Sequence, residues 1–68
     1  MKLSARNMLA GKIIEVKKGA TTSHVKIDIG GKVVTAAITN EAVEELKLTA
    51  GQAAYAVIKA SDVMVAVD

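Results

Sequence analysis

The chain has no cysteine, no proline, no phenylalanine and no tryptophan, and Tyr55 is its only aromatic residue. Without cysteine it has neither disulfides nor thiolate metal ligands. A single tyrosine is too little for the stacking platform on which single-stranded nucleic acids are bound. No apolar stretch approaches the roughly 20 residues of a membrane span, and residues 1–6 contain no apolar signal region. We therefore expect a cytoplasmic protein with no membrane partner and no nucleic-acid partner.

Small aliphatic side chains dominate the composition, since 51% of the 68 residues are hydrophobic and only one of these is aromatic. A domain of this size buries only about 60% of the surface that its unfolded chain exposes, so additional burial is needed for stability. We expect a homo-oligomer whose subunits cover the apolar surface, and a tightly wrapped monomer is the alternative. The net charge of +2 neither demands nor excludes an anionic partner.

The first half of the chain has the pattern of three strands. Residues 11–18 form a β-branched run, residues 23–29 alternate apolar and polar side chains, and residues 32–39 are again rich in β-branched residues. A two-residue link, Gly30-Gly31, joins the second and third runs and predicts a hairpin. These two strands should therefore be antiparallel neighbours.

The second half changes pattern at Thr39. A capping-type residue precedes helix formers up to Leu46, which predicts one short helix. Residues 53–58 and 63–67 then return to strand composition. The predicted fold class is all-β with one short helix, in a single domain of residues 1–68. Its strands would close a five-stranded OB-like β-barrel, in the order of three strands, the helix and two strands.

The last predicted strand is apolar on both of its faces. Val63, Val65 and Val67 lie on one face, and Met64 and Ala66 lie on the other. A strand of a one-sided sheet would alternate apolar and polar residues. Such strands should therefore be covered once by their own barrel and once by another chain.

No recognisable catalytic set is present, and we expect no enzyme and no metal ligation. The single histidine, His24, falls on the polar face of its strand and is interpreted as solvent-facing. The acidic residues Glu41, Glu44 and Glu45 are interpreted as a solvated helix face rather than a metal site. Gly30-Gly31 lacks the downstream lysine and the helix of a phosphate-binding loop.

Two short segments carry the chemistry that remains. Ser4 and Arg6 near the start, and Lys59 and Ser61 near the end, each pair a hydroxyl with a cation two residues away. In an extended backbone this spacing puts both side chains on one face. If the two pairs meet, they form a donor-only pocket for a tetrahedral dianion, which disfavours protonated phosphate relative to sulfate, molybdate or tungstate. The alternative is a mobile tail and an ordinary edge lysine.

Three motifs, in this order along the chain, give the sequence a resemblance to a known family. They are Ser4-Ala5-Arg6-Asn7, Ala37-Ile38-Thr39 and the run from Val57 to Met64. Together they resemble the molbindins, the small Mop or molybdenum-pterin-binding proteins, whose module also occurs in molybdate-responsive regulators and molybdate transporter ATPase subunits. The resemblance covers essentially the whole chain.

The resemblance implies a five-stranded OB-like barrel that assembles as a hexamer, a trimer of dimers. It also implies that molybdate or tungstate binds between subunits through its oxygens, without direct ligation of the metal. The residues it implies for this site are Ser4, Ala5, Arg6 and Asn7 from one chain and Thr39, Lys59, Ala60 and Ser61 from a neighbouring chain.

One position departs from the family, because Met8 stands where its members commonly have glutamine. Methionine cannot repeat the polar contacts of glutamine. The sequence also lacks the aromatic walls that suit a pterin ring, so the oxyanion is taken as the ligand. We expect binding and intracellular storage of molybdate and tungstate. A nucleic-acid-binding OB-like module and a structural oligomer without a small ligand are the alternatives.

Overall fold

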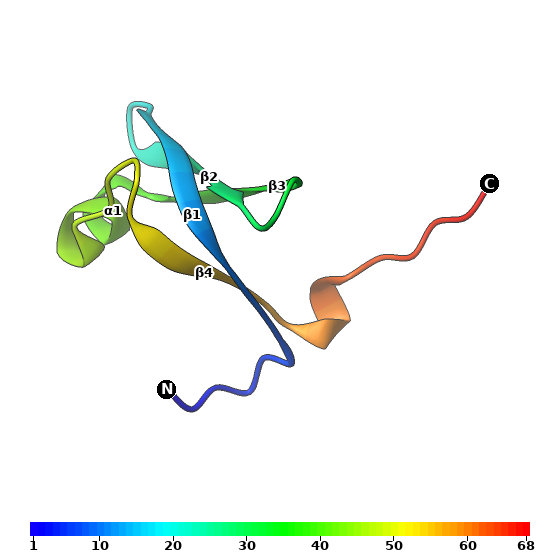
Figure 1. Ribbon diagram of the computed structural model, residues 1–68. Helices are drawn as coiled ribbons and strands as arrows, with labels where there is room; N and C mark the ends of the chain where they lie inside the picture. Colours follow the sequence, from blue (N-terminus) through cyan, green and yellow to red (C-terminus); the bar gives the residue numbers. More distant parts are fainter.

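Four antiparallel strands and one short helix make up the protein, seen in a computed structural model that describes residues 1–68. The sheet has the order β3-β2-β1-β4 and curls into a half-barrel, with α1 beside one end of it (Figure 1). The elements are β1 (Asn7–Lys18), β2 (Thr22–Asp28), β3 (Val33–Thr39), α1 (Asn40–Leu46), β4 (Ala53–Ile58) and the 3-10 turn η1 (Ala60–Asp62).

The predicted fifth strand, and with it the closed five-stranded barrel, is wrong for this chain. Residues 63–67 have strand composition but pair with no strand, and every residue from Val63 to Asp68 is exposed. The physical reason is that strand propensity reflects packing against neighbours, and η1 directs the chain away from both open edges of the sheet (Figure 1). The four earlier strands and the helix are confirmed.

An irregularity in β1 lets this long strand pair with two other strands. Its first half pairs with β4 and its second half with β2, and the register shifts between Ile13 and Glu15, which leaves Ile14 as an extra residue. Ile13 is buried, Ile14 and Glu15 are exposed, and Val16 turns inward again. The bulge therefore changes which face points to the core and bends the sheet.

The predicted hairpin between β2 and β3 is confirmed. Asp28 pairs with Val33, and Gly30 and Gly31 both have positive φ values, +105° and +95°. Two-residue hairpins of the primed type need such values at their centre, and glycine adopts them without a steric penalty. Both glycine N–H groups donate to the Asp28 carboxylate at 2.9 Å, and these hydrogen bonds lower the pKa of Asp28.

Gly11 is required where β1 crosses the end of β2. A Cβ at this position would collide with the Asp28 carbonyl oxygen and lie 2.9 Å from Cγ2 of Ile27. Any larger residue would push apart two paired strands at the bend of the half-barrel.

The core is small and wholly aliphatic. Ile13, Val25, Ile27, Val43 and Ala56 are its only buried hydrophobic residues. Many large apolar side chains remain on the surface, among them those of the C-terminal segment. This imbalance fits the size argument from the sequence, in which one chain cannot bury its own apolar surface.

Candidate functional site

The two sequence motifs lie next to each other because β1 begins where β4 ends. Asn7, the first residue of β1, pairs with Ile58, the last residue of β4. The Nδ2 group of Asn7 donates to the Ile58 carbonyl oxygen at 3.1 Å, which ties the two strand ends together. Ser4-Ala5-Arg6 directly precedes this pair and Lys59-Ala60-Ser61 directly follows it, so both motifs lie at one end of the sheet.

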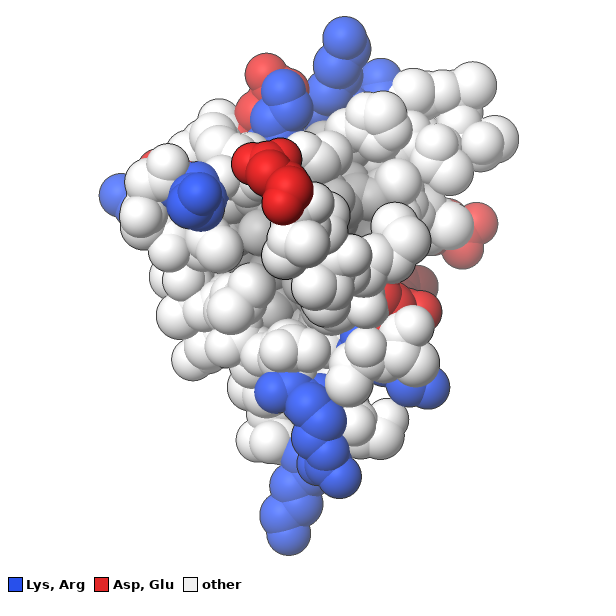
Figure 2. Space-filling view, turned by 90° about the vertical axis from the view of Figure 1, so that its right-hand side faces the viewer, with Lys and Arg blue, Asp and Glu red and all other residues white.

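This end of the molecule is cationic. Figure 2 shows Lys and Arg side chains projecting from the lower end of the molecule, which in Figure 1 holds the start of β1 and the end of β4. The ion pairs in the structure join Lys18 to Glu44 and Lys26 to Glu15, so neither Arg6 nor Lys59 is neutralised by a carboxylate. Both are exposed and available to an anion.

The local backbone differs from the extended form that the sequence reasoning assumed. Ala60–Asp62 form a 3-10 turn, closed by the Asp62 N–H donating to the Lys59 carbonyl oxygen at 2.9 Å. The rule that alternate residues share a face holds in a strand but not in a turn with three residues per revolution. The prediction that Lys59 and Ser61 share one face, which assumed an extended backbone, is therefore wrong. In its place, a 3-10 turn leaves the N–H groups at its start without partners inside the turn.

Thr39 lies at the other end of the sheet. It pairs with Thr22, next to the pair formed by Ser23 and the last residue of β1, Lys18. Most of the length of β1 therefore separates Thr39 from Arg6 within one chain. A site that contains both residues needs two copies, and that contribution of a neighbouring chain stays a prediction.

Thr39 is held ready to donate a hydrogen bond. Its backbone is extended and its Oγ1 accepts the Ala42 N–H at 3.1 Å, which makes it the N-cap of α1, as predicted. A hydroxyl that accepts this bond still has its own proton to donate. The exposed Thr39 side chain can thus cap the helix and bind an oxyanion at the same time.

A polar cluster behind Thr39 fixes its position, and the sequence reasoning missed it. Ser23 is fully buried and its hydroxyl hydrogen-bonds Asn40, the first residue of α1. The Asn40 Nδ2 group donates to the carbonyl oxygens of Gly19 at 3.1 Å and Ala20 at 3.4 Å. A serine on the otherwise apolar face of β2 was the available signal.

The remaining polar residues form no second candidate site. His24 is exposed, which confirms its solvent-facing interpretation, and Glu41, Glu44 and Glu45 are exposed on α1, as expected of a solvated helix face. No group of three or more His, Cys, Asp or Glu side chains is arranged to hold a metal ion. No helix is long and apolar enough to cross a bilayer.

Met8, the position that departs from the molbindin pattern, contributes apolar surface. It pairs with Val57 across β1 and β4, and both side chains are more than 40% exposed. The apolar pair stands beside the Asn7–Ile58 pair and makes no polar contact.

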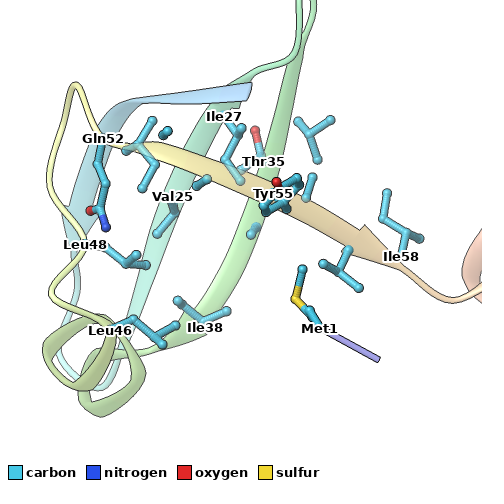
Figure 3. Close-up of a pocket in the computed structure, with 17 residues that line it drawn as sticks. Met1, Val25, Ile27, Thr35, Ile38, Leu46, Leu48, Gln52, Tyr55 and Ile58 are labelled. Atoms are coloured by element: carbon cyan, nitrogen blue, oxygen red, sulfur yellow. The ribbon is translucent and has the colours of Figure 1, made fainter. Parts of the chain in front are cut away.

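An apolar groove opens between the two edge strands of the half-barrel. It encloses about 710 Å³ and is lined by 17 residues, of which 15 are hydrophobic. Figure 3 shows Val25, Ile38, Leu46 and Leu48 around this space, with β4 crossing it. The sequence did not reveal these apolar walls. The groove reaches Met1 and Ile58 at the cationic end, and its polar side-chain groups are those of Thr35, Gln52 and Tyr55.

Comparison with known proteins places the chain in a family. Residues 3–65 match the TOBE domain model. A probable molybdenum-pterin-binding protein of Haemophilus influenzae is 48% identical over 69 residues, covering 100% of both chains. A molybdate-binding protein from Sporomusa ovata has a solved structure with 35% identity and a TM-score of 0.93, covering 97% of this chain and 98% of that one.

A third similar protein has been solved with its ligand. The cytoplasmic molybdate-binding protein ModG, with molybdate bound, is 43% identical at a TM-score of 0.89, over 94% of this chain and 46% of that chain. All three relatives are named as binding proteins and not as enzymes, which confirms the expectation from the sequence. The chain is a TOBE domain and belongs to the family of molybdenum-pterin-binding proteins, the molbindins.

Proposed function

We propose that this protein binds molybdate, and also tungstate, as intact oxyanions at the cationic end of the sheet. The observation that carries the proposal is the Asn7–Ile58 pair, which brings the Ser4–Arg6 and Lys59–Ser61 segments to one place. Arg6 and Lys59 supply two positive charges that no carboxylate neutralises. The similarity to ModG, a protein solved with molybdate bound, supports the same ligand.

The donors of this site match a tetrahedral dianion. Ser4 and Ser61 offer hydroxyls, and Ala5, Asn7 and Ala60 offer backbone N–H groups close to the two cations. The Asn7 side chain is already engaged with Ile58, so its part is to hold the motifs together. Charge-assisted hydrogen bonds to such donors are about twice as strong as neutral ones.

Thr39 completes the site from a neighbouring copy in this proposal. Its position at the far end of the sheet excludes it from the site of its own chain, whereas its free hydroxyl proton suits an oxyanion oxygen. The protein would then act as a homo-oligomer with anions between its subunits. A hexamer built as a trimer of dimers is the assembly that the family resemblance implies.

Storage of the oxyanion in the cytoplasm is the proposed role of the single domain of residues 1–68. Its surface carries large exposed apolar side chains that suit subunit contacts. ModG is described as cytoplasmic, which supports the same compartment.

Isothermal titration of the purified protein tests this function. Titration with molybdate and with tungstate should give saturable heats, while phosphate and a short single-stranded oligonucleotide should give none. A heat of binding with the oligonucleotide alone would instead favour the nucleic-acid module. The absence of a heat of binding with every ligand would favour a structural oligomer without a small ligand.

A further inference from the structure

Ser23 is the only buried polar residue of the protein. Its side chain lies on the face of β2 that carries Val25 and Ile27, and its exposed fraction is 0%. Its hydroxyl donates to Oδ1 of Asn40, the first residue of α1. A buried hydroxyl costs free energy unless it is hydrogen-bonded, and an alanine would fill this position without that cost. What the hydroxyl adds is direction, because its hydrogen bond determines where Asn40 lies.

Asn40 is held by further hydrogen bonds besides the one from Ser23. Its Nδ2 group donates to the carbonyl oxygens of Gly19 and Ala20, and its backbone N–H donates to the Thr21 carbonyl oxygen at 3.0 Å. Together these hydrogen bonds attach the start of α1 to the turn between β1 and β2 and to the beginning of β2.

The helix α1 depends on such an attachment. It has only seven residues, and a helix of this length is not stable in water without tertiary contacts. Val43 is its only buried residue, so apolar packing holds the middle of the helix. The hydrogen bonds of Asn40 hold its first turn.

The direction of the Thr39 hydroxyl depends on that first turn. The backbone of Thr39 is fixed on one side by its pairing with Thr22 and on the other by Asn40, the next residue. Its Oγ1 accepts the Ala42 N–H at 3.1 Å, and this N–H lies beside Oγ1 because the first turn of α1 is formed. Loss of the Ser23–Asn40 hydrogen bond would therefore loosen the turn and free the Thr39 side chain to rotate.

We propose that Ser23 and Asn40 are positioning residues of the anion site, which act through Thr39. They hold the first turn of α1, so that the Thr39 hydroxyl is already directed before the anion arrives. The inference rests on the proposed function, in which Thr39 of one copy donates to molybdate at the cationic end of another. A donor that is fixed in advance loses little rotational freedom on binding, which raises the affinity for the anion. Neither Ser23 nor Asn40 contacts the anion in this arrangement.

The double variant Ser23→Ala/Asn40→Leu in the full chain tests the proposal. It replaces both partners by apolar side chains, so that no buried donor is left unpaired and the protein should remain folded. Gly19 and Ala20 are exposed, and water can replace the lost amide at their carbonyl oxygens. Isothermal titration should show molybdate binding that is roughly three- to tenfold weaker than in the parent protein. Ser23→Ala alone should show a smaller loss in the same direction.

A double-mutant cycle with Thr39→Val shows whether the pair acts through Thr39. Thr39→Val removes the hydroxyl and should itself weaken molybdate binding. In that background, Ser23→Ala/Asn40→Leu should cause no further loss of affinity, because there is no hydroxyl left to position. A further loss of the same size as in the parent protein would contradict the proposal.

A core variant controls for a general loss of stability. Ile27→Val removes one buried methyl group from the same strand and lowers the free energy of unfolding, but it leaves Ser23 and Asn40 unchanged. Its affinity for molybdate should equal that of the parent protein. If Ile27→Val weakened binding as much as the double variant, the effect would be one of stability and the proposal would be wrong.

Hydrogen exchange of the Ala42 amide gives a readout that needs no anion. In the protein without molybdate, the Ala42 N–H should exchange several times faster in the double variant than in the parent protein. The Gly51 N–H, which donates to the Ile13 carbonyl oxygen at 2.7 Å, is the control amide and should be unchanged. Unchanged exchange at Ala42, or parental molybdate affinity of the double variant, would overturn the positioning role.

Failure of the proposed function would look different from failure of this inference. If the parent protein gave no heat with molybdate, the anion site itself would be wrong, and the exchange at Ala42 would still decide whether Ser23 and Asn40 hold Thr39. If the parent protein bound molybdate and Thr39→Val weakened the binding while the double variant did not, the positioning role alone would be wrong.

Discussion

Asn7 and Ile58 face each other at the end of the sheet, and the side-chain amide of Asn7 donates to the Ile58 carbonyl oxygen at 3.1 Å. This one pair joins two motifs that are more than fifty residues apart in sequence. It makes the end of the half-barrel the place where Arg6 and Lys59 concentrate positive charge. The predictions for ligand binding depend on this relationship.

Removal of either cation should weaken molybdate binding. Arg6→Ala and Lys59→Ala should each cost roughly 1.5 to 3 kcal/mol, or about one to two decades in affinity, because a charge-assisted hydrogen bond is lost. Lys59→Arg should also weaken binding, since a planar guanidinium does not replace a compact ammonium. Lys17→Ala, an exposed cation elsewhere on β1, is the control for net charge in the titrations. Full affinity in both alanine variants would exclude these residues from the site.

Mixed oligomers can establish whether Arg6 and Lys59 of one site come from the same chain. Arg6→Ala and Lys59→Ala chains are unfolded together, refolded as a mixture and titrated with molybdate. If a site takes the two cations from different chains, about one quarter of the sites should regain full affinity by random assembly. If both cations come from one chain, every site lacks one of them and none should recover.

Thr39 should have two separable roles, as a helix cap and as a hydroxyl donor. Thr39→Asp keeps a good N-cap, so thermal stability should be retained, but its carboxylate should repel the oxyanion and abolish binding. Thr39→Ser should retain both properties. Thr39→Val should lose about 1 kcal/mol of stability as well as affinity. Unimpaired molybdate binding by the aspartate variant would remove Thr39 from the site.

Gly11 should tolerate no side chain. Gly11→Ala should lower the free energy of unfolding by roughly 1 to 3 kcal/mol, because the new methyl group meets the Asp28 carbonyl and the strands must separate. Denaturant unfolding measures the change. Ala10→Ser, at the exposed neighbouring position, should unfold like the parent protein.

The β2–β3 hairpin should lose stability in acid. The Gly31 and Gly30 N–H groups hold the pKa of Asp28 below its ordinary value, so the folded state favours the carboxylate. The Asp28 carboxylate therefore contributes fully to stability above the pKa that Asp28 has in the unfolded chain. This contribution is lost as the pH falls through the lowered pKa of Asp28 in the folded state. NMR titration of the Asp28 carboxyl carbon should show the lowered pKa. Asp28→Asn should remove this part of the pH dependence of thermal stability, and an unshifted titration would contradict it.

The strands, the helix and the motifs could be predicted because each depends on local chemistry. The glycine pair determines the hairpin, the cap at Thr39 begins the helix, and the alternation in β2 separates the core face from the polar face. The serine and cation pairs at the two termini likewise predicted an anion site from their residue types, and that site stays a prediction.

The sequence by itself determined four of the strands and the start of the helix, and it predicted which side chains offer donors to a dianion, since these follow from local propensity and donor chemistry. Only the tertiary structure decided that Asn7 meets Ile58, that Thr39 lies at the opposite end and that Val63–Val67 finds no partner in its own chain. The first two relationships come from the β1–β4 and β2–β3 pairings, and the bulge in β1 and the turn η1 set the course of the chain between and beyond them. Each redirects the chain through a few backbone torsions, and no hydrophobic pattern in the sequence records such torsions.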